Sequence, residues 1–509
     1  MKKNIIIAEL LLAITLVFGS CTNLDEEIYG SLSPDNYYQT EEEALSSVVG
    51  VYQKLSDIVS IGAGWRPSVL GTDEFFVPAR TNGGWYDGGI WIEYAQHNVS
   101  ASNELNRRAW VSIFNTIGAA NAVIESLEQS PNADDLSALI AETRALRAYA
   151  YFYAMDFWGN VPIFTAARVD ALNLPSTDSR ADVYNFIVDE LNAAAADLPS
   201  VNNVTRKEYY PRFTKEAVYT ALATVYLNAE VYTGTAHWGD VITMCDNVIS
   251  TNAYSLEDRV GDCFLATNEE NSTEIISSFS IDPNQKAGNN QFMLYTNHAL
   301  DKKKYDLPFT PADGYSFNDE PVDRYEMGDE RLDMIEYGPQ YYLNGDPLLK
   351  DDNDPNSQLV ITPVQDIFAA GNDEGYHLLK YSPIGVTWSA YNADNDFVLN
   401  RYSDILLMKA EAIFRTNGST SEAVGLVNEV RERSNASDLS TLTLEDLENE
   451  RACEFIWEGH RRRDMIRFGS YFSETWSFKT TTTPEWRGIY PIPEEQLNAN
   501  PNLVQNPNY

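Results

Sequence analysis

The sequence predicts a mainly α-helical fold that carries one long, loop-rich insert with short strands. In several segments, apolar or small residues recur at i, i+3, i+4 and i+7, which is the period of an amphipathic helix. Between about residues 258 and 399 this period is lost, and Gly, Pro, Asn, Asp and Tyr become frequent. Short runs in that stretch, such as Ile275–Phe279, favour strands.

The helices are expected in two blocks, at about 34–257 and 400–468, with a C-terminal tail at 469–509. Small residues such as Ala145, Ala148, Ala221 and Ala410 stand at close-packing positions. This is typical of stacked helical hairpins, so we predict a TPR-like scaffold with an irregular repeat in a single domain, 21–509. The individual helices are expected at 44–56, 106–129, 137–157, 182–197, 237–250, 403–416 and 444–468, and around Val218–Val225 and Ala423–Val430.

Residues 1–20 are predicted to be a secretory signal peptide. Two lysines precede an apolar stretch, Ile5–Phe18, which is shorter than the roughly 20 apolar residues that span a bilayer. Gly19 and Ser20 then precede Cys21, an arrangement that resembles a bacterial lipoprotein cleavage site. We therefore expect Cys21 to be lipidated; the alternative is an ordinary signal peptide with a chance cysteine.

The charge and the cysteines narrow the class of protein. With 36 Lys and Arg against 75 Asp and Glu, the net charge is −39, which repels polyanions and argues against nucleic acid as a partner. Cys245, Cys263 and Cys453 show neither a CxxC motif nor a His-paired metal spacing. We expect buried thiols, with a disulfide as the alternative.

Motifs of known catalytic centres are absent from the sequence. It has no His-Glu-x-x-His, Gly-x-Ser-x-Gly, P-loop or dinucleotide-binding motif, and its five histidines are scattered. The acidic run at 351–354 lacks the Gly and the distal Glu of an EF-hand, so a solvated loop is expected there rather than a calcium site. We predict no catalytic residue, cofactor or required metal. A glycosidase needs only two well-placed carboxylates, and the 75 acidic residues leave such a pair open as an alternative.

Several long motifs follow one another along essentially the whole mature chain. They are Ala141-Glu-Thr-Arg-Ala-Leu-Arg-Ala-Tyr, Phe157-Trp-Gly-Asn-Val-Pro-Ile, Arg401-Tyr-Ser-Asp-Ile-Leu-Leu-Met-Lys-Ala-Glu-Ala, Glu458-Gly-His-Arg-Arg-Arg-Asp and Asn500-Pro-Asn-Leu-Val-Gln-Asn-Pro-Asn-Tyr. In this order the motifs resemble the SusD/RagB family. Near the C-terminus, Asn508 stands where the family usually has Gly.

The resemblance implies a monomeric, lipid-anchored protein on the outer-membrane surface. Such a protein captures oligosaccharide for a SusC-like TonB-dependent transporter and performs no chemistry itself. The acidic run Asp25–Glu27 resembles the export tag of surface lipoproteins in Bacteroidota. Within the motifs, Arg144, Arg147 and a pair between Glu458 and Arg462 are expected to serve helix packing rather than ligand binding.

One glycine-rich loop, at residues 71–91, carries the residue types that a sugar site needs. Sugars offer apolar C–H faces to flat rings and hydroxyls to planar polar groups. We expect the rings of Trp85, Tyr86 and Trp91 to stack on ligand, or else form a loop core in which at least one Trp is buried. The expected hydrogen-bonding residues of the loop are Asp73, Arg80, Asn82 and Asp87.

The resemblance adds a second set of candidates on the insert. The loop sequence Trp85-Tyr-Asp-Gly-Gly-Ile-Trp resembles a subgroup that binds β-glucans such as laminarin. Two other functions stay open: a peptide-binding RagB-like component and a surface glycoside hydrolase. The insert candidates are Asn289, Asn290, Tyr295, Tyr315, Tyr341 and Trp388.

Overall fold

The computed structural model describes residues 40–205, 209–268, 272–281 and 290–509. Residues Tyr38–Tyr509 form one compact unit. Within the described residues helices prevail and the few strands are short, so the predicted mainly α fold class is confirmed. The predicted leader, the lipidation site Cys21 and the candidate Asn289 lie outside the described residues.

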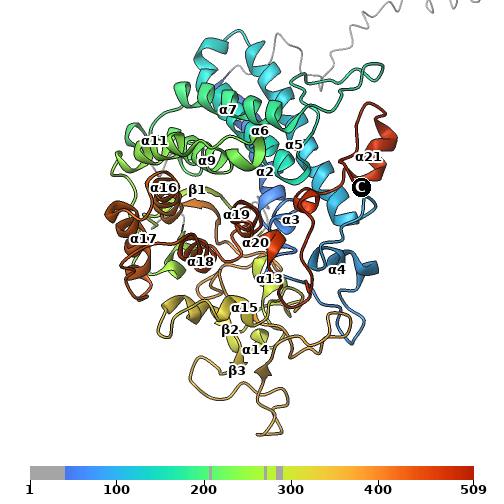
Figure 1. Cartoon of the computed structure of the whole chain (residues 1–509), viewed down its shortest axis with the longest axis vertical. Helices are drawn as coiled ribbons and strands as arrows, with labels where there is room; N and C mark the ends of the chain where they lie inside the picture. The colour runs from blue at the N-terminus through green and yellow to red at the C-terminus, as the bar shows by residue number, and fades with distance from the viewer. Residues whose placement is uncertain (1–39, 206–208, 269–271, 282–289) are drawn as a thin grey trace, which may run out of the picture. The chain divides into compact units, whose positions relative to one another are not determined.

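The first block of helices forms a serial stack. In this stack α5 packs on α6, α6 on α7, α7 on α9 and α9 on α11, while α2 covers α5 and α6 (Figure 1). This is the neighbour-to-neighbour packing expected of helical hairpins. The bounds are α2 Glu41–Val59, α3 Trp65–Val69, α4 Ile90–Ala95, α5 Glu104–Glu128, α6 Ser137–Trp158, α7 Arg180–Asp197, α9 Lys215–Leu227, α10 Ala229–Thr233 and α11 Trp238–Ile249.

The second block continues the stack through α16, which packs on α11 and on α17. The predicted helix 444–468 is wrong in one respect, because it is broken into α18 and α19. At the break, Trp457 and Gly459 have φ of 59° and 82°, which a continuous right-handed helix does not allow. The bounds are α16 Tyr402–Asn417, α17 Ser421–Arg433, α18 Leu444–Glu454, α19 Arg461–Phe468, α20 Ser470–Ser473 and α21 Glu494–Ala499.

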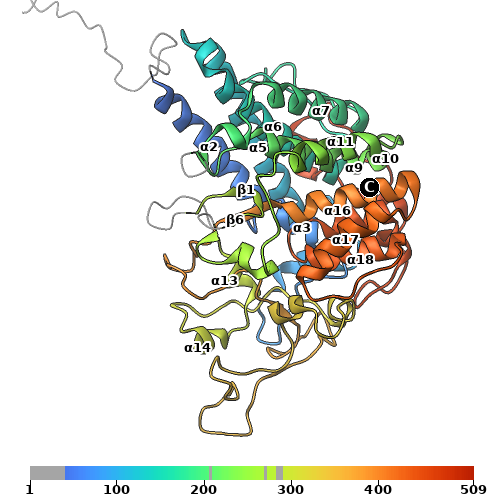
Figure 2. The same cartoon turned by 90° about the vertical axis from the view of Figure 1, so that its left-hand side faces the viewer.

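Among the described residues, three nested antiparallel strand pairs close the insert. Strand β1 (Ile275–Phe279) pairs with β6 (Phe397–Arg401), so the two ends of the insert lie side by side (Figure 2). Inside this pair, β2 (Ile335–Glu336) pairs with β5 (His377–Leu378), and β3 (Gly338–Pro339) pairs with β4 (Val360–Ile361). Short α-helices complete it: α13 Phe292–Thr296, α14 Asp301–Tyr305 and α15 Asp319–Val322.

Six 3₁₀ turns among the described residues link these elements. Two of them, η5 and η6, belong to the insert and return below. Their bounds are η2 Asp87–Gly89, η3 Ala133–Leu136, η4 Val201–Asn203, η5 Val260–Phe264, η6 Glu330–Met334 and η7 Glu485–Gly488.

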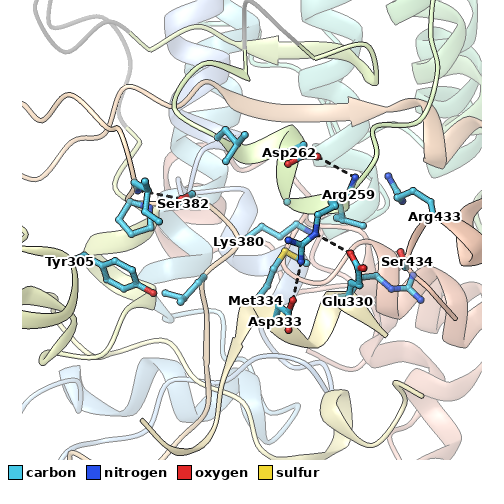
Figure 3. Close-up of a pocket in the computed structure, with 17 residues that line it drawn as sticks. Arg259, Asp262, Tyr305, Glu330, Asp333, Met334, Lys380, Ser382, Arg433 and Ser434 are labelled. Carbon is cyan, nitrogen blue, oxygen red and sulfur yellow. Dashed lines mark hydrogen bonds and ion pairs between the residues drawn. The ribbon is translucent and has the colours of Figure 1, made fainter. Parts of the chain in front are cut away.

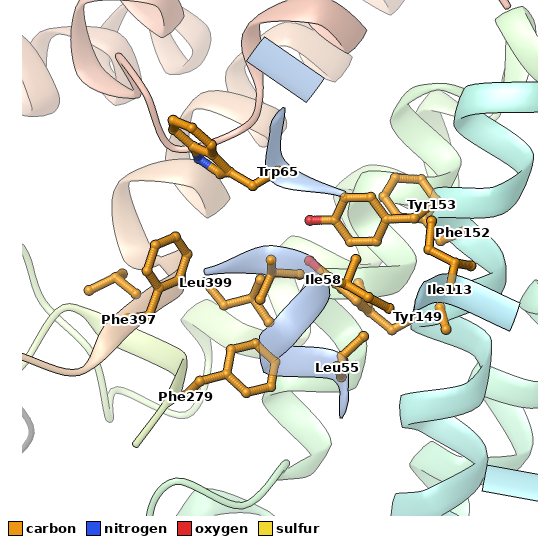
Figure 4. Packing of buried hydrophobic residues seen from close by; sticks show 14 of the residues in the cluster. Leu55, Ile58, Trp65, Ile113, Tyr149, Phe152, Tyr153, Phe279, Phe397 and Leu399 are labelled. Carbon is orange, nitrogen blue, oxygen red and sulfur yellow. The ribbon is translucent and has the colours of Figure 1, made fainter. Parts of the chain in front are cut away.

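One hydrophobic core runs from the helices into the insert. Figure 4 shows Leu55 and Ile58 of α2 among rings of α6 and apolar side chains of the β1–β6 pair. The predicted buried thiols are confirmed, because Cys245, Cys263 and Cys453 are free and buried. None of the helices within the described ranges combines the length and the apolarity that crossing a membrane needs.

Ion pairs within the family motifs support packing, but not all as expected. Arg144 and Arg147 of α6 both pair with Glu190 of α7, which ties neighbouring helices together. The expected pair between Glu458 and Arg462 is wrong. Glu458 instead pairs with Arg401 at 2.7 Å and with Lys380, and Arg462 pairs with Asp156 at 3.2 Å, because the break before α19 turns the two side chains apart.

Candidate functional site

Four aromatic side chains gather where the loop 71–91 meets α13. The Trp85 ring centroid lies 5.8 Å from that of Trp91, 5.9 Å from Tyr295 and 5.8 Å from Tyr315. Tyr295 stacks on Tyr315 at 5.4 Å. Two sets of predicted aromatics, more than 200 positions apart in the sequence, thus meet in one place, which we call the aromatic cluster.

The backbone of the loop fixes the position of Trp85. Its φ of 62° lies in the left-handed region, which costs a non-glycine residue roughly 1–3 kcal/mol. The indole Nε1 donates a hydrogen bond to Ala312 O at 2.9 Å. A Cβ added at Gly314 would lie 2.3 Å from the indole ring, so the ring rests directly against the Gly314 backbone. The loop backbone therefore sets the direction of the Trp85 side chain, and Ala312 and Gly314 of the insert hold its indole.

A pocket of about 490 Å³ opens beside the cluster. Its wall combines rings, two aliphatic side chains and charged groups from four separate helices and the loop, a mixture typical of small-molecule sites. We call it the aromatic pocket. It is lined by Arg66, Trp85, Asp87, Ile90, Trp91, Glu104, Leu105, Arg108 and Tyr295.

The charged groups of the aromatic pocket are held in fixed orientations. Arg66 donates from Nε to the Tyr315 hydroxyl at 2.7 Å, and its guanidinium lies 5.8 Å from the Trp91 ring centroid and 5.7 Å from that of Tyr295. Burial lowers the pKa of Arg66, but the neighbouring tyrosines outweigh it and the pKa is raised. Among the described residues this is the one hydrogen bond of the Arg66 side chain, so its two Nη groups remain for a ligand.

The N-terminal turn of α5 supplies an ionised carboxylate at the pocket. Hydrogen bonds from Arg107 at 2.7 Å and Arg108 at 2.8 Å lower the pKa of Glu104 to about 2. On the loop side, Asp87 Oδ2 accepts from Trp91 Nε1 at 2.8 Å. Carboxylate oxygens and guanidinium groups therefore face the same space as the rings, which is the pairing that hydroxyl-rich ligands need.

The predicted loop residues separate into two groups. Trp85, Trp91 and Asp87 line the pocket; Trp91 is only 5% exposed, so the expected alternative of a buried Trp holds for that ring. Tyr86 is 52% exposed but is not part of the lining. Asn82 is exposed and its Oδ1 accepts from Gly84 N at 2.9 Å, which closes the turn of the loop.

Three predicted hydrogen-bonding residues are buried and fully engaged within the protein, so they are corrections to the expected site. Asp73 pairs with Arg324 and with Arg461 at 2.6 Å, and these arginines lower its pKa to about 2 against the opposing effect of burial. Arg80 donates to Asp313, Gly371, Glu374 and Ser316. Asn290 bonds Asn395 O and Phe292 N.

The insert candidates also divide. Tyr295 lines the pocket, whereas Tyr315 is fully buried beneath the cluster and supports it. Tyr341 is 47% exposed in the β3–β4 hairpin, and Trp388 packs against Phe309 at 5.0 Å; neither belongs to the pocket lining. The insert thus contributes the Tyr295 ring to the pocket lining and the buried Tyr315 ring to the packing beneath the aromatic cluster.

Sequence reasoning missed five lining residues: Arg66, Ile90, Glu104, Leu105 and Arg108. They lie on short or ordinary helical segments, where their spacing matches any solvent-facing helix. Only Glu104 gave a usable signal, since an acid in the first turn followed by arginines at i+3 and i+4 predicts ion pairs. That signal indicates helix stability and not a site.

Comparison with known sequences identifies the family. The SusD family model matches residues 262–509, and a second model, described as "Starch-binding associating with outer membrane", matches residues 34–227. The starch-binding protein SusD of Bacteroides thetaiotaomicron is 28% identical over 462 residues, which cover 81% of this chain and 80% of that protein.

Solved structures share the fold over nearly the whole chain. Surface glycan-binding protein A from Bacteroides thetaiotaomicron, in complex with laminarihexaose, matches with a TM-score of 0.75 at 22% identity, covering 92% of this chain and 99% of that one. A laminarin binding SusD-like protein matches with a TM-score of 0.74 at 22% identity, covering 93% and 100%. The sequence models, the relatives and the fold agree, and the chain belongs to the SusD/RagB family.

Proposed function

We propose that this protein is a non-catalytic glycan-binding protein of the cell surface, and that the aromatic pocket receives neutral oligosaccharide. The observation that carries the proposal is the fixed arrangement of Trp85 and Tyr295 beside Arg66, Asp87 and Glu104. A sugar ring can place its C–H face on Trp85 or Tyr295 while its hydroxyls meet the guanidinium and the carboxylates.

Charge favours a neutral ligand over an anionic one. The net charge is −39, and Glu104 and Asp87 add acceptors at the pocket itself. Among neutral glycans, β-glucans such as laminarin are the leading candidate, because two proteins of the same fold are described by laminarin or laminarihexaose binding. Starch is the alternative, since the relative SusD is a starch-binding protein.

The family also suggests the setting in which the pocket operates. We infer a lipid anchor at Cys21, a position on the outer surface of the outer membrane, and delivery of the bound oligosaccharide to a SusC-like TonB-dependent transporter. The family model described as associating with the outer membrane supports this setting. The ligand would then be released to the transporter unmodified.

A binding screen tests the proposal. The protein without residues 1–21 is compared on laminarin, starch, xylan and an anionic polysaccharide by affinity electrophoresis, and hits are titrated calorimetrically with their oligosaccharides. We expect binding to a neutral glucan and no new reducing ends on long incubation. New reducing ends would favour a glycoside hydrolase, and binding to peptide mixtures alone would favour the RagB-like alternative.

A matched pair of variants locates the site. Trp85→Ala should weaken oligosaccharide binding about tenfold or more, since a lost ring contact of about 1.4 kcal/mol changes affinity by that factor. Tyr341→Ala removes an exposed ring of the insert outside the pocket and should leave the dissociation constant unchanged. Both are measured by calorimetry. An equal loss of affinity in the two variants, or a loss of affinity in Tyr341→Ala alone, would indicate that the ligand contacts the β3–β4 hairpin and would contradict the proposed site.

A further inference from the structure

A second pocket lies between the insert and the C-terminal end of α17, and its lining shares no residue with the aromatic pocket. We call it the insert pocket. Its volume is about 340 Å³, and small-molecule sites have about 300–1,000 Å³. It is enclosed by η5, the end of α14, η6, the segment after β5 and the residues Arg433 and Ser434 (Figure 3).

The insert pocket combines apolar side chains with planar polar groups. Figure 3 shows Tyr305 at one side and Arg259 at the other. The Arg259 guanidinium lies between two carboxylates, at 3.0 Å from Glu330 and 2.9 Å from Asp333, so donors and acceptors stand next to each other. Apolar surface is supplied by Leu265, Met334, Leu379, Pro383 and Ile384, of which Leu265 and Ile384 are exposed.

Two polar groups in the wall are buried without a hydrogen-bond partner among the described residues. They are the Ser434 hydroxyl and Arg433 Nε, and both atoms are covered by the wall itself, so an occupant does not reach them. The polar side chains that an occupant can reach are Arg259, Glu330 and Asp333, which are 53%, 44% and 71% exposed.

The charges of the wall argue for an occupant without net charge. Each cation is already paired within the protein: Lys380 with Glu458 at 2.6 Å, Arg331 with Glu450 at 2.6 Å and Arg433 with Glu274 at 2.8 Å, besides Arg259. An anion would have to displace a carboxylate from one of these pairs. A wholly apolar ligand would instead strip water from Arg259 and its carboxylates without replacing the lost hydrogen bonds.

We propose that the insert pocket is a second saccharide-binding site, which takes one or two units of a neutral sugar independently of the aromatic pocket. The apolar side chains meet the C–H face of the sugar, while Arg259, Glu330 and Asp333 meet its hydroxyls. With one tyrosine ring and no tryptophan, the site is weaker than the aromatic pocket, and its dissociation constant is on the order of 1 mM. The ligand class is shared with the proposed function; the residues are not.

Methionine-methyl NMR provides a reporter inside the insert pocket. Met334 lines it, and its signal among the eight methionines is assigned with Met334→Leu. The protein is titrated with glucose, maltose and cellobiose. We expect a saturable shift of the Met334 signal. The same titration in Trp85→Ala should give the same shift, which separates this site from the aromatic pocket whether or not the aromatic pocket binds.

A blocking variant supplies the control. A Cβ at Gly261 in the lining meets no atom within 4 Å, so a side chain can start there without a clash, and Gly261→Phe is chosen to occupy the pocket. Gly239 on α11 has equally open surroundings away from the pocket. Gly261→Phe should abolish the Met334 shift, and Gly239→Phe should preserve it. No shift with any of the sugars up to their solubility, or an unchanged shift in Gly261→Phe, would overturn the inference and leave the proposed function untouched.

Discussion

Gly314 determines where the Trp85 indole can lie. Replacing it by alanine places a methyl group 2.3 Å from the ring, so the indole must move away from Ala312 O and from the pocket. Gly314→Ala should therefore weaken oligosaccharide binding about tenfold and lower the free energy of unfolding by about 1–3 kcal/mol. Calorimetry and urea unfolding measure the two effects.

The control for this prediction is a glycine in open surroundings. A Cβ at Gly118 in the middle of α5 meets no atom within 4 Å, so Gly118→Ala should keep binding unchanged and raise the free energy of unfolding by about 0.5–1 kcal/mol. Full binding by Gly314→Ala would show that the indole does not depend on this contact.

Glu74, within the loop 71–91, makes the stability of the protein depend on pH. Burial raises its pKa from 4.5 to about 8, although Arg461 acts in the opposite direction. A carboxyl with a higher pKa in the folded state binds more protons when folded, so its contribution to stability is lost as the pH rises from about 4.5 to about 8. Glu74→Gln removes this loss. Relative to that variant, the free energy of unfolding of the wild type should fall by up to about 1.4 kcal/mol for each pH unit in this window.

Urea unfolding at several pH values measures this difference. The amide of Glu74→Gln can still accept from Trp457 N, as the carboxyl does at 3.2 Å. Exposed Glu485 provides the comparison, because Glu485→Gln should leave the pH dependence of the wild type intact. Parallel stability curves for the wild type and Glu74→Gln would contradict the prediction.

The loop polar residues show how far sequence could predict the site. The loop and its residues Trp85, Trp91 and Asp87 were predicted from residue type, and these three residues line the aromatic pocket. Asp73 and Arg80 are also polar residues of this loop, but their side chains already pair with Arg461 and Asp313, which lie more than 200 positions away in the sequence. A sequence without known contacts does not reveal which polar groups are already satisfied.

At the scale of elements, local signals were reliable and long-range ones were not. The capping box of Thr443 and Asp446, a pattern that the sequence itself displays, starts α18. The break that ends α18 was not predicted, since it depends on Trp457, whose indole donates to Glu74 O at 2.6 Å from a distant loop. Likewise the insert showed strand-like runs, but its nested closure depends on pairs such as Ile275 with Arg401.

At the scale of the whole molecule, buried charges join the insert to the helices. Arg401, at the end of β6, pairs with Glu274 before β1 at 2.6 Å, with Glu454 of α18 at 2.8 Å and with Glu458 at 2.7 Å. Arg401, Glu274 and Glu454 are buried, and the side chain of Glu458 is 7% exposed. Burial opposes the charge of Arg401, but the carboxylates outweigh it and its pKa is raised. One guanidinium therefore connects both ends of the insert to the second helical block.

Arg401→Met tests this connection. It keeps an apolar side chain of similar length but leaves three buried carboxylates short of a partner, so the free energy of unfolding should fall by about 3–5 kcal/mol. Lys303→Ala breaks an exposed pair with Asp352 and should change the free energy of unfolding by about 0–1 kcal/mol. Urea unfolding followed by circular dichroism measures both. Equal effects of the two substitutions would mean that the buried network contributes no more than a surface pair, and the hydrophobic core alone would then have to hold the insert on the helices.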